Sequence, residues 1–264
     1  MSACRVMLVA TYAICQLVVA SQPALGVPIL QLYVEGGKYD PVGQSWVYSG
    51  APNPDGSVDF RLWIIGNPNP RGPIYDVRVS VAYASVLRSG GYDLLFSWRP
   101  SVTGGLGGFF DPSYPPAVSF VQAGPAGSRP VISGTSLLPS HGVFGPGTVW
   151  QEFRLGDFVL KDSPLGDFVT SFPQPGKLRG QINVYDVSVR HTGGMSLMDY
   201  RLHFDAYGYV LRNCRRQPVH APFSHDAEVN VVPNPPSLVL TLWLLAGGGV
   251  GFIRHYFRHK LGGT

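Results

Sequence analysis

An alternation of apolar and polar side chains with a period of two constrains the fold of this chain more than any other feature. It is clearest in residues 30–35, 58–64, 76–81 and 201–206, where an apolar residue returns at every second position. Because successive side chains of a strand point to opposite faces, each run places one apolar row inward and one polar row outward. The pattern predicts half-buried antiparallel strands.

Further strands are expected at residues 92–98, 149–160, 181–190 and 228–232. The segments between them are rich in glycine and proline, of which the chain has 33 and 24, and these residues favour repeated turns. A long apolar period of 3.6 residues, typical of helices, is missing from this region. The sequence therefore predicts an all-β fold, with a single antiparallel β-sandwich or jelly-roll-like domain over residues 27–231.

Residues 101–148 interrupt the alternation. The segment is rich in Gly, Pro and Ser and is too long for an ordinary hairpin loop. We expect it to form an ordered excursion over one end of the sandwich.

Residues 1–26 have the features of a secretory signal peptide. Arg5 precedes an uncharged apolar run that is short for a membrane-spanning helix and is followed by small residues. An uncleaved anchor is the alternative. Cleavage would remove Cys4 and Cys15 and leave Cys214 alone, so we expect no internal disulfide in the mature chain.

The C-terminal tail, residues 232–264, differs from the strand-forming region. An uncharged stretch follows two prolines and precedes a basic cluster that includes Arg254, Arg258 and Lys260. This order predicts one transmembrane helix over residues 237–253, with its basic end in the cytoplasm and the β domain outside. A buried core helix is the alternative, but it would not explain the basic end.

The distribution of charge argues against a nucleic-acid partner. The chain has 20 Lys and Arg residues and 16 Asp and Glu residues. Four of the basic residues lie in the two terminal segments, whereas all the acidic residues lie between them, so the central region is formally neutral. A nucleic-acid surface would need clustered basic residues in the domain itself.

One predicted strand carries a conspicuous polar row. Arg201, His203, Asp205, Tyr207 and Tyr209 alternate along it and so share one face. A histidine beside a carboxylate can serve as a general base, but such a row is also typical of a solvated sheet face. We favour the second interpretation and expect these side chains to face water.

Catalytic motifs are missing from the sequence. Ser140 and His141 are adjacent, but adjacency does not bring a nucleophile, a base and an orienting group together in space. The sequence has no nucleophile elbow, phosphate-binding glycine loop or dinucleotide fingerprint. It therefore predicts a non-catalytic domain, and a secreted hydrolase is the third functional hypothesis.

His220, His225 and Asp226 lie near one another in a segment that we expect to be a loop. Imidazole and carboxylate groups suit zinc, and carboxylates suit calcium, but the ligand spacing of well-known sites is missing. The sequence therefore predicts no metal site and no cofactor. These three residues, and a structural Ca²⁺ ion held by acidic turn residues, are the alternatives.

Aromatic side chains suggest a second functional hypothesis, a carbohydrate-binding module for an exopolysaccharide. The candidates for stacking on sugar rings are Trp46, Trp63, Trp98, Trp150, Tyr207 and Tyr209. Residues of these types also pack in cores. The hypothesis therefore requires several of the rings to be exposed in a row.

The tail carries a specific resemblance. Val232, Pro233, Asn234 and Pro235 precede the apolar stretch, and the basic cluster follows it. This order is similar to a PEP-CTERM sorting signal, which exosortase, a membrane-embedded protease, processes in exopolysaccharide-making Gram-negative bacteria. Asn234 stands where that signal usually has Glu. The resemblance implies two partners, the inner membrane and an exosortase.

Segments of the domain carry a second resemblance, among them RLWIIGN at 61–67, IYDVRVSVAYA at 74–84, GQINVYDVSV at 180–189 and APFSHDAE at 221–228. They are similar to the choice-of-anchor N proteins over nearly all of residues 28–230. Members share an ectodomain and use different C-terminal anchors, and the family implies no catalytic residue. The resemblance implies an exported bacterial cell-surface or extracellular-matrix protein, anchored first in the inner membrane.

Overall fold

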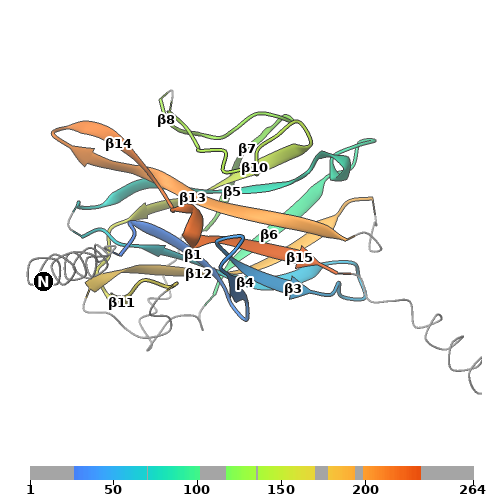
Figure 1. The fold of residues 1–264 in the computed structure, drawn as a ribbon, viewed down its shortest axis with the longest axis horizontal. Coiled ribbons are helices and arrows are strands. Elements are labelled where there is room, and N and C mark those ends of the chain that lie inside the picture. The colour runs from blue at the N-terminus through green and yellow to red at the C-terminus, as the bar shows by residue number, and fades with distance from the viewer. Residues whose placement is uncertain are drawn as a thin grey trace, which may run out of the picture.

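The structure is a computed structural model that describes residues 27–69, 71–101, 117–134, 136–169, 178–193 and 199–232. These residues form strands and two short 3-10 helices (Figure 1). The strands are β1 (Leu30–Val34), β2 (Lys38–Asp40), β3 (Ser45–Gly50), β4 (Val58–Gly66), β5 (Ile74–Ala84), β6 (Leu94–Pro100), β7 (Ser119–Gly124), β8 (Val131–Ser133), β9 (Ser136–Leu137), β10 (Thr148–Phe158), β11 (Ser163–Leu165), β12 (Leu178–His191), β13 (Tyr200–Arg212), β14 (Arg215–His220) and β15 (Asp226–Val231). The helices are η1 (Ser85–Leu87) and η2 (Phe223–His225).

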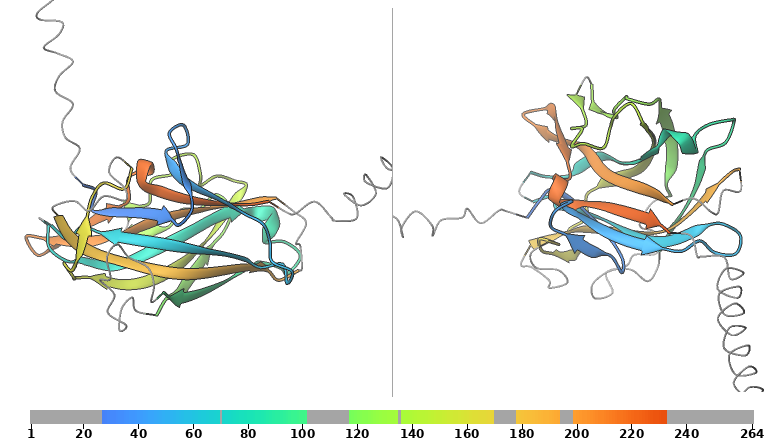
Figure 2. Two further views of the ribbon diagram at one scale, coloured as in Figure 1. Left: turned by 90° about the horizontal axis from the view of Figure 1, so that it is seen from below. Right: turned by 45° about the vertical axis from the view of Figure 1, so that its right-hand side comes forward.

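The all-β prediction is confirmed. Two large sheets pack face to face, as Figure 1 and Figure 2 show. The five-stranded sheet has the order β1-β4-β12-β11, with β6 also paired to β12. The eight-stranded sheet has the order β2-β3-β15-β13-β5-β10-β7, with β14 paired to β13, and β8 and β9 form a separate ladder. Every run predicted from the alternation overlaps one of these strands.

The apolar rows of the two sheets meet in one core. Phe60, Leu62 and Ile64 of β4 are buried in it, and the rings of Phe60 and Phe204 join the sheets with centroids 5.5 Å apart. Burying each large apolar side chain stabilises the fold by about 1.5–3 kcal/mol. Cys214 is exposed and free, so burial rather than a disulfide holds the described domain together.

One pairing differs from the antiparallel prediction. β15 pairs with β3 in parallel, with Asp226 opposite Ser45 and Val231 opposite Gly50. The two strands come from opposite ends of the domain and no hairpin joins them, so the connection does not require an antiparallel arrangement. The eight-stranded sheet is therefore mixed, and β15 lies between β3 and β13.

Much of the described part of the excursion predicted over one end of the sandwich lies instead over a face, and residues 102–116 of that prediction lie outside the described residues. Its strand β7 extends the eight-stranded sheet, and residues 125–134 and 136–147, which we call the covering segment, lie against the outer face of that sheet (Figure 1). A buried apolar cluster joins the two; its members are Ile132, Leu138 and Phe144 of the covering segment with Ala82, Trp150 and Tyr207 of the sheet. The central part of β13 is consequently buried on both faces.

The predictions for the two ends of the chain lie outside the described residues. They are the signal peptide at residues 1–26, the transmembrane helix at 237–253 and the basic cluster behind it. Within the part of the chain that the structure describes, no helix is long and apolar enough to cross a membrane.

Candidate metal centre

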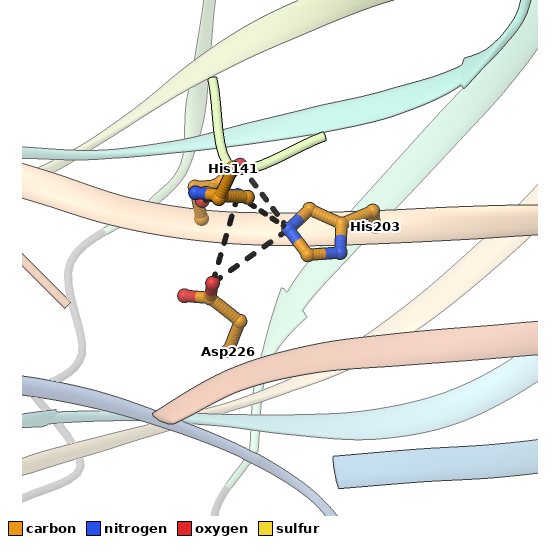
Figure 3. A group of neighbouring side chains, drawn as sticks. His141, His203 and Asp226 are labelled. Atoms are coloured by element: carbon orange, nitrogen blue, oxygen red, sulfur yellow. Dashed lines mark hydrogen bonds and ion pairs between the residues drawn. The ribbon is translucent and has the colours of Figure 1, made fainter. Parts of the chain in front are cut away.

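Four side chains converge beneath the covering segment: His141, His203, Asp205 and Asp226. His203 and Asp205 are two positions apart in β13, so strand alternation places both on the outer face. Asp226 begins β15, the antiparallel neighbour of β13. His141 comes from the covering segment, and Figure 3 shows its ring directed at His203 and Asp226.

The distances within this cluster are those of a coordination shell. His141 Nε2 lies 3.1 Å from His203 Nε2 and 3.0 Å from Asp205 Oδ1. Asp226 Oδ2 lies 3.7 Å from the Nε2 atom of each histidine. In a tetrahedral zinc site with bonds of about 2.0–2.2 Å, neighbouring ligand atoms are about 3.3–3.5 Å apart. These four separations bracket that value, and all the donor atoms of the cluster lie within 4.8 Å of one another.

The cluster is shielded from solvent. The exposed fraction of the side chain is 7% for each histidine, 3% for Asp205 and 1% for Asp226. The ring of Phe223 packs edge-on against His141, with centroids 4.2 Å apart. Both carboxylate oxygens of Asp226 are buried without a hydrogen bond from any described residue. Because a buried carboxylate without a donor is costly, these oxygens point to a cation as their partner.

Glu228 orients His203 from the side opposite the cluster. Its Oε1 atom lies 3.1 Å from His203 Nδ1, and Arg201 forms an ion pair with the same oxygen. A carboxylate accepts hydrogen bonds, so the Nδ1 proton faces Glu228 and Nε2 is the ring atom that faces the cluster. A histidine held by a carboxylate in this way is the usual second layer of a metal site.

The electrostatics of the cluster also favour a cation. Burial lowers the pKa of His203, but Asp205 and the neighbouring carboxylates outweigh burial and raise that pKa to about 10. Burial raises the pKa of Asp205, but His203 and His141 outweigh it and hold that pKa at about 2. Burial, and then the charge of Asp205, raises the pKa of Asp226 well above its usual value. A second negative charge on Asp226 beside Asp205 is therefore unfavourable in this buried place, and a divalent cation would offset it.

The donor set indicates which cation fits. Two imidazole nitrogens and two carboxylate oxygens suit zinc and related transition metals, whereas calcium and magnesium prefer shells made of oxygen. Four donors of these types are typical of a zinc site. The cluster is thus a better fit to zinc than to the calcium ion considered from the sequence.

Of the three histidine and aspartate candidates named from the sequence, only Asp226 lies in the cluster. His220 Nδ1 is 2.8 Å from Ala221 O, and His225 Nε2 is 3.0 Å from Asp167 Oδ1. His220 thus contacts the neighbouring residue and His225 contacts a carboxylate in the loop after β11, and neither converges with Asp226.

The prediction that the polar row of β13 faces water is wrong at its centre. His203, Asp205 and Tyr207 are 6%, 2% and 0% exposed. The covering segment excludes water from them, and the Tyr207 hydroxyl donates to Glu152 Oε1 at 2.6 Å. The sequence did contain a signal, because His203 and Asp205 form a His-x-Asp pair on one strand face. However, His141, another member of the four-residue cluster, lies far away in the chain.

The predicted sugar-stacking rings do not form an exposed row. Trp63, Trp150 and Tyr207 are buried in apolar clusters. Trp46 and Trp98 are half-buried and pack against the core. Tyr209 is half-buried and stacked on Tyr75. These rings pack against other side chains on both sides of the sheets, so the six residues do not provide the platform that the carbohydrate hypothesis requires.

Comparison with known proteins adds only distant structural likeness. No family model matches the chain, and no curated protein matches it. One similar solved structure is AvmM, which catalyses macrocyclization in alchivemycin A biosynthesis; it is 12% identical, with 77% of this chain and 100% of that chain covered and a TM-score of 0.29.

Two other similar structures are collagen-binding domains. The subdomain ACE19 of the Enterococcus faecalis surface protein ACE is 10% identical, with 76% of this chain and 96% of that chain covered and a TM-score of 0.25. The domain from a Staphylococcus aureus adhesin is 9% identical, with 69% of this chain and 93% of that chain covered and a TM-score of 0.20. Likeness at this level carries no weight for function.

Proposed function

We propose that this protein is an exported β-sandwich protein of the bacterial surface or matrix whose domain binds one transition-metal ion, zinc by preference, in a structural centre. The observation that carries the metal-binding part is the convergence of His141, His203, Asp205 and Asp226 in a closed site at coordination distances. The signal-like N-terminus and the sorting-signal-like tail support export.

The closed site supports a structural ion rather than a catalytic one. Catalytic zinc keeps one coordination position open for water or substrate. Here four protein side chains supply donors, and none of them is more than 7% exposed. A non-catalytic domain therefore agrees better with this centre than the secreted hydrolase does.

The substitution Asp226→Asn tests the centre, because it keeps the shape of the side chain and removes its charge. The full chain, dialysed against buffer, should retain equimolar zinc by plasma mass spectrometry, and the variant should lose it. The variant should also melt above the metal-free wild type, since it removes a buried unpaired charge, but below the zinc-loaded wild type.

His220→Asn is the matched control, because His220 lies outside the cluster. It should retain zinc like the wild type. Equal zinc contents in the wild type and in Asp226→Asn would refute the proposed centre.

Mass spectrometry of the mature protein tests the export part separately. A signal peptide predicts a new N-terminus within residues 21–27, and processing by an exosortase predicts a C-terminus near Pro233–Pro235. A peptide that still contains Lys260, recovered from surface material, would exclude that processing.

A further inference from the structure

The four ligands of the centre are divided unequally between two parts of the fold. His203, Asp205 and Asp226 belong to neighbouring strands of the eight-stranded sheet. His141 belongs to the covering segment, which approaches the sheet from outside (Figure 3). A metal ion at this place would therefore bind one part of the fold to the other.

The other polar contacts of the covering segment lie mostly within the segment or near the start of β10, which we call its base. Leu138 N–H donates to Pro130 O inside the segment. Near the base, Trp150 Nε1–H donates to Ser128 at 3.0–3.2 Å. Among the described residues, His141 supplies the side-chain polar contacts that the segment makes with β13 and β15. Polar attachment to the middle of the sheet thus depends on this one side chain.

The backbone at His141 is consistent with a side chain that is held in place. Its φ of 24° lies in a region that non-glycine residues rarely adopt, and such a conformation persists when the surroundings enforce it. Gly142 follows with a φ of 83°, which completes a tight turn that presents the imidazole to the sheet.

We infer that the metal ion is the clasp that holds the covering segment on the eight-stranded sheet. This inference rests on the proposed function, because it needs the centre to bind metal. The three sheet residues form a partial site that binds the ion first, and His141 then closes the shell and brings the segment down. Metal occupancy thereby decides whether this face of the sheet is covered.

The apolar anchors of the segment are too few to replace the clasp. Ile132, Leu138 and Phe144 are its buried apolar contacts with the sheet. These three side chains would have to offset the conformational entropy that the whole segment, which contains several times as many residues, loses when it is ordered. This loss is the largest cost of ordering a chain. Release of the segment would expose the buried Glu152 and Tyr207 to water while the two-sheet core stays folded.

Hydrogen exchange of the full chain, followed by mass spectrometry with zinc and with a chelator, tests the clasp. Chelation should speed exchange in peptides of the covering segment by about tenfold or more, as expected for local opening. Peptides of β5 and β13 should keep most of their protection. Chymotrypsin should cut after Phe144, which is 9% exposed in the folded protein, in the chelated sample only.

The variant His141→Ala with added imidazole separates metal binding from the clasp. Imidazole can occupy the vacated position on the ion, so zinc content should recover toward that of the wild type. The covering segment should nevertheless exchange as fast as in the chelated wild type, because the free imidazole is not joined to the chain. His220→Ala, with or without imidazole, should match the wild type in both measurements.

The outcomes distinguish the two proposals. If the wild type contains no zinc after incubation with it, the proposed function fails and the clasp fails with it. If zinc binds but leaves exchange in the segment unchanged, or if its removal unfolds the whole domain, the clasp is wrong and the metal centre stands. Failure of His141→Ala to bind zinc with imidazole would contradict the partial site on the sheet.

Discussion

The outer faces of the two sheets start from the same sequence pattern and reach opposite environments. On the five-stranded sheet, Arg61 forms ion pairs with Asp186 at 2.9 Å and Glu35 at 3.3 Å, and all three side chains are 30–51% exposed. They line an open cleft of about 890 Å³. On the eight-stranded sheet, His203 and Asp205 lie in an equivalent alternating row but are buried.

The difference comes from what lies on top of each row. Among the described residues, Phe168 covers part of the five-stranded sheet, where it packs on Trp63. The covering segment shields the centre of the other sheet, including His203. Exposed ion pairs contribute little because water and salt screen them, whereas buried carboxylates need a compensating charge. A polar row therefore becomes a site only where another segment excludes water from it.

Removal of the metal should produce the largest effect. Zinc at about a thousand times its dissociation constant stabilises the folded state by about 4 kcal/mol. For a domain of roughly two hundred residues, chelation should lower the melting temperature by roughly 8–16 °C. Calorimetry with zinc and with a chelator measures the shift. If chelation leaves the melting temperature unchanged, the buried row of the eight-stranded sheet holds no stabilising metal ion, and the proposed contrast with the solvated row is wrong.

Truncation of one covering side chain at a time should have the next largest effect. Phe144→Ala and Phe168→Ala should each cost about 3 kcal/mol in free energy of unfolding, because each removes a buried ring. Only Phe144→Ala should also weaken zinc binding, since Phe144 belongs to the segment that carries His141. Denaturant unfolding and zinc titration measure the two quantities. Equal zinc affinities in the two variants would show that the cover is irrelevant to the centre.

Substitution of Glu228, which contacts His203 from the side opposite the cluster, should have a smaller effect. Glu228→Gln keeps a hydrogen-bond acceptor for His203 Nδ1 but loses the negative charge, so the affinity for zinc should fall by about tenfold. Competition with a chelating dye measures the change. An affinity equal to that of the wild type would exclude Glu228 as a positioning residue.

The exposed ion pair should have the smallest effect. Asp186→Asn removes the partner of Arg61 on the open face and should change the free energy of unfolding by less than about 1 kcal/mol. High salt should abolish the difference. A loss as large as that of Phe144→Ala would mean that the two faces do not differ as proposed.

Much of the fold could be predicted because alternation is a local property. The runs that contain Leu62 and Phe204 lie in strands whose apolar residues are buried in the core. The parallel pairing of β3 with β15 could not be predicted in the same way, because it depends on how distant strands are placed in the sheet. Of the candidate site, the sequence indicated Asp226 as a candidate ligand and singled out the polar row that contains His203.

What the sequence by itself determined is the main core strands, such as β4 and β13, their apolar faces and the β class, because each follows from the direction of neighbouring side chains along the chain. The tertiary structure alone decided that the covering segment lies over β13 and that His141 meets three residues at least 62 positions away from it. Alternation defines the two faces of a strand without determining whether water or protein covers either one. That choice, made by long-range packing, separates the buried centre from the solvated row.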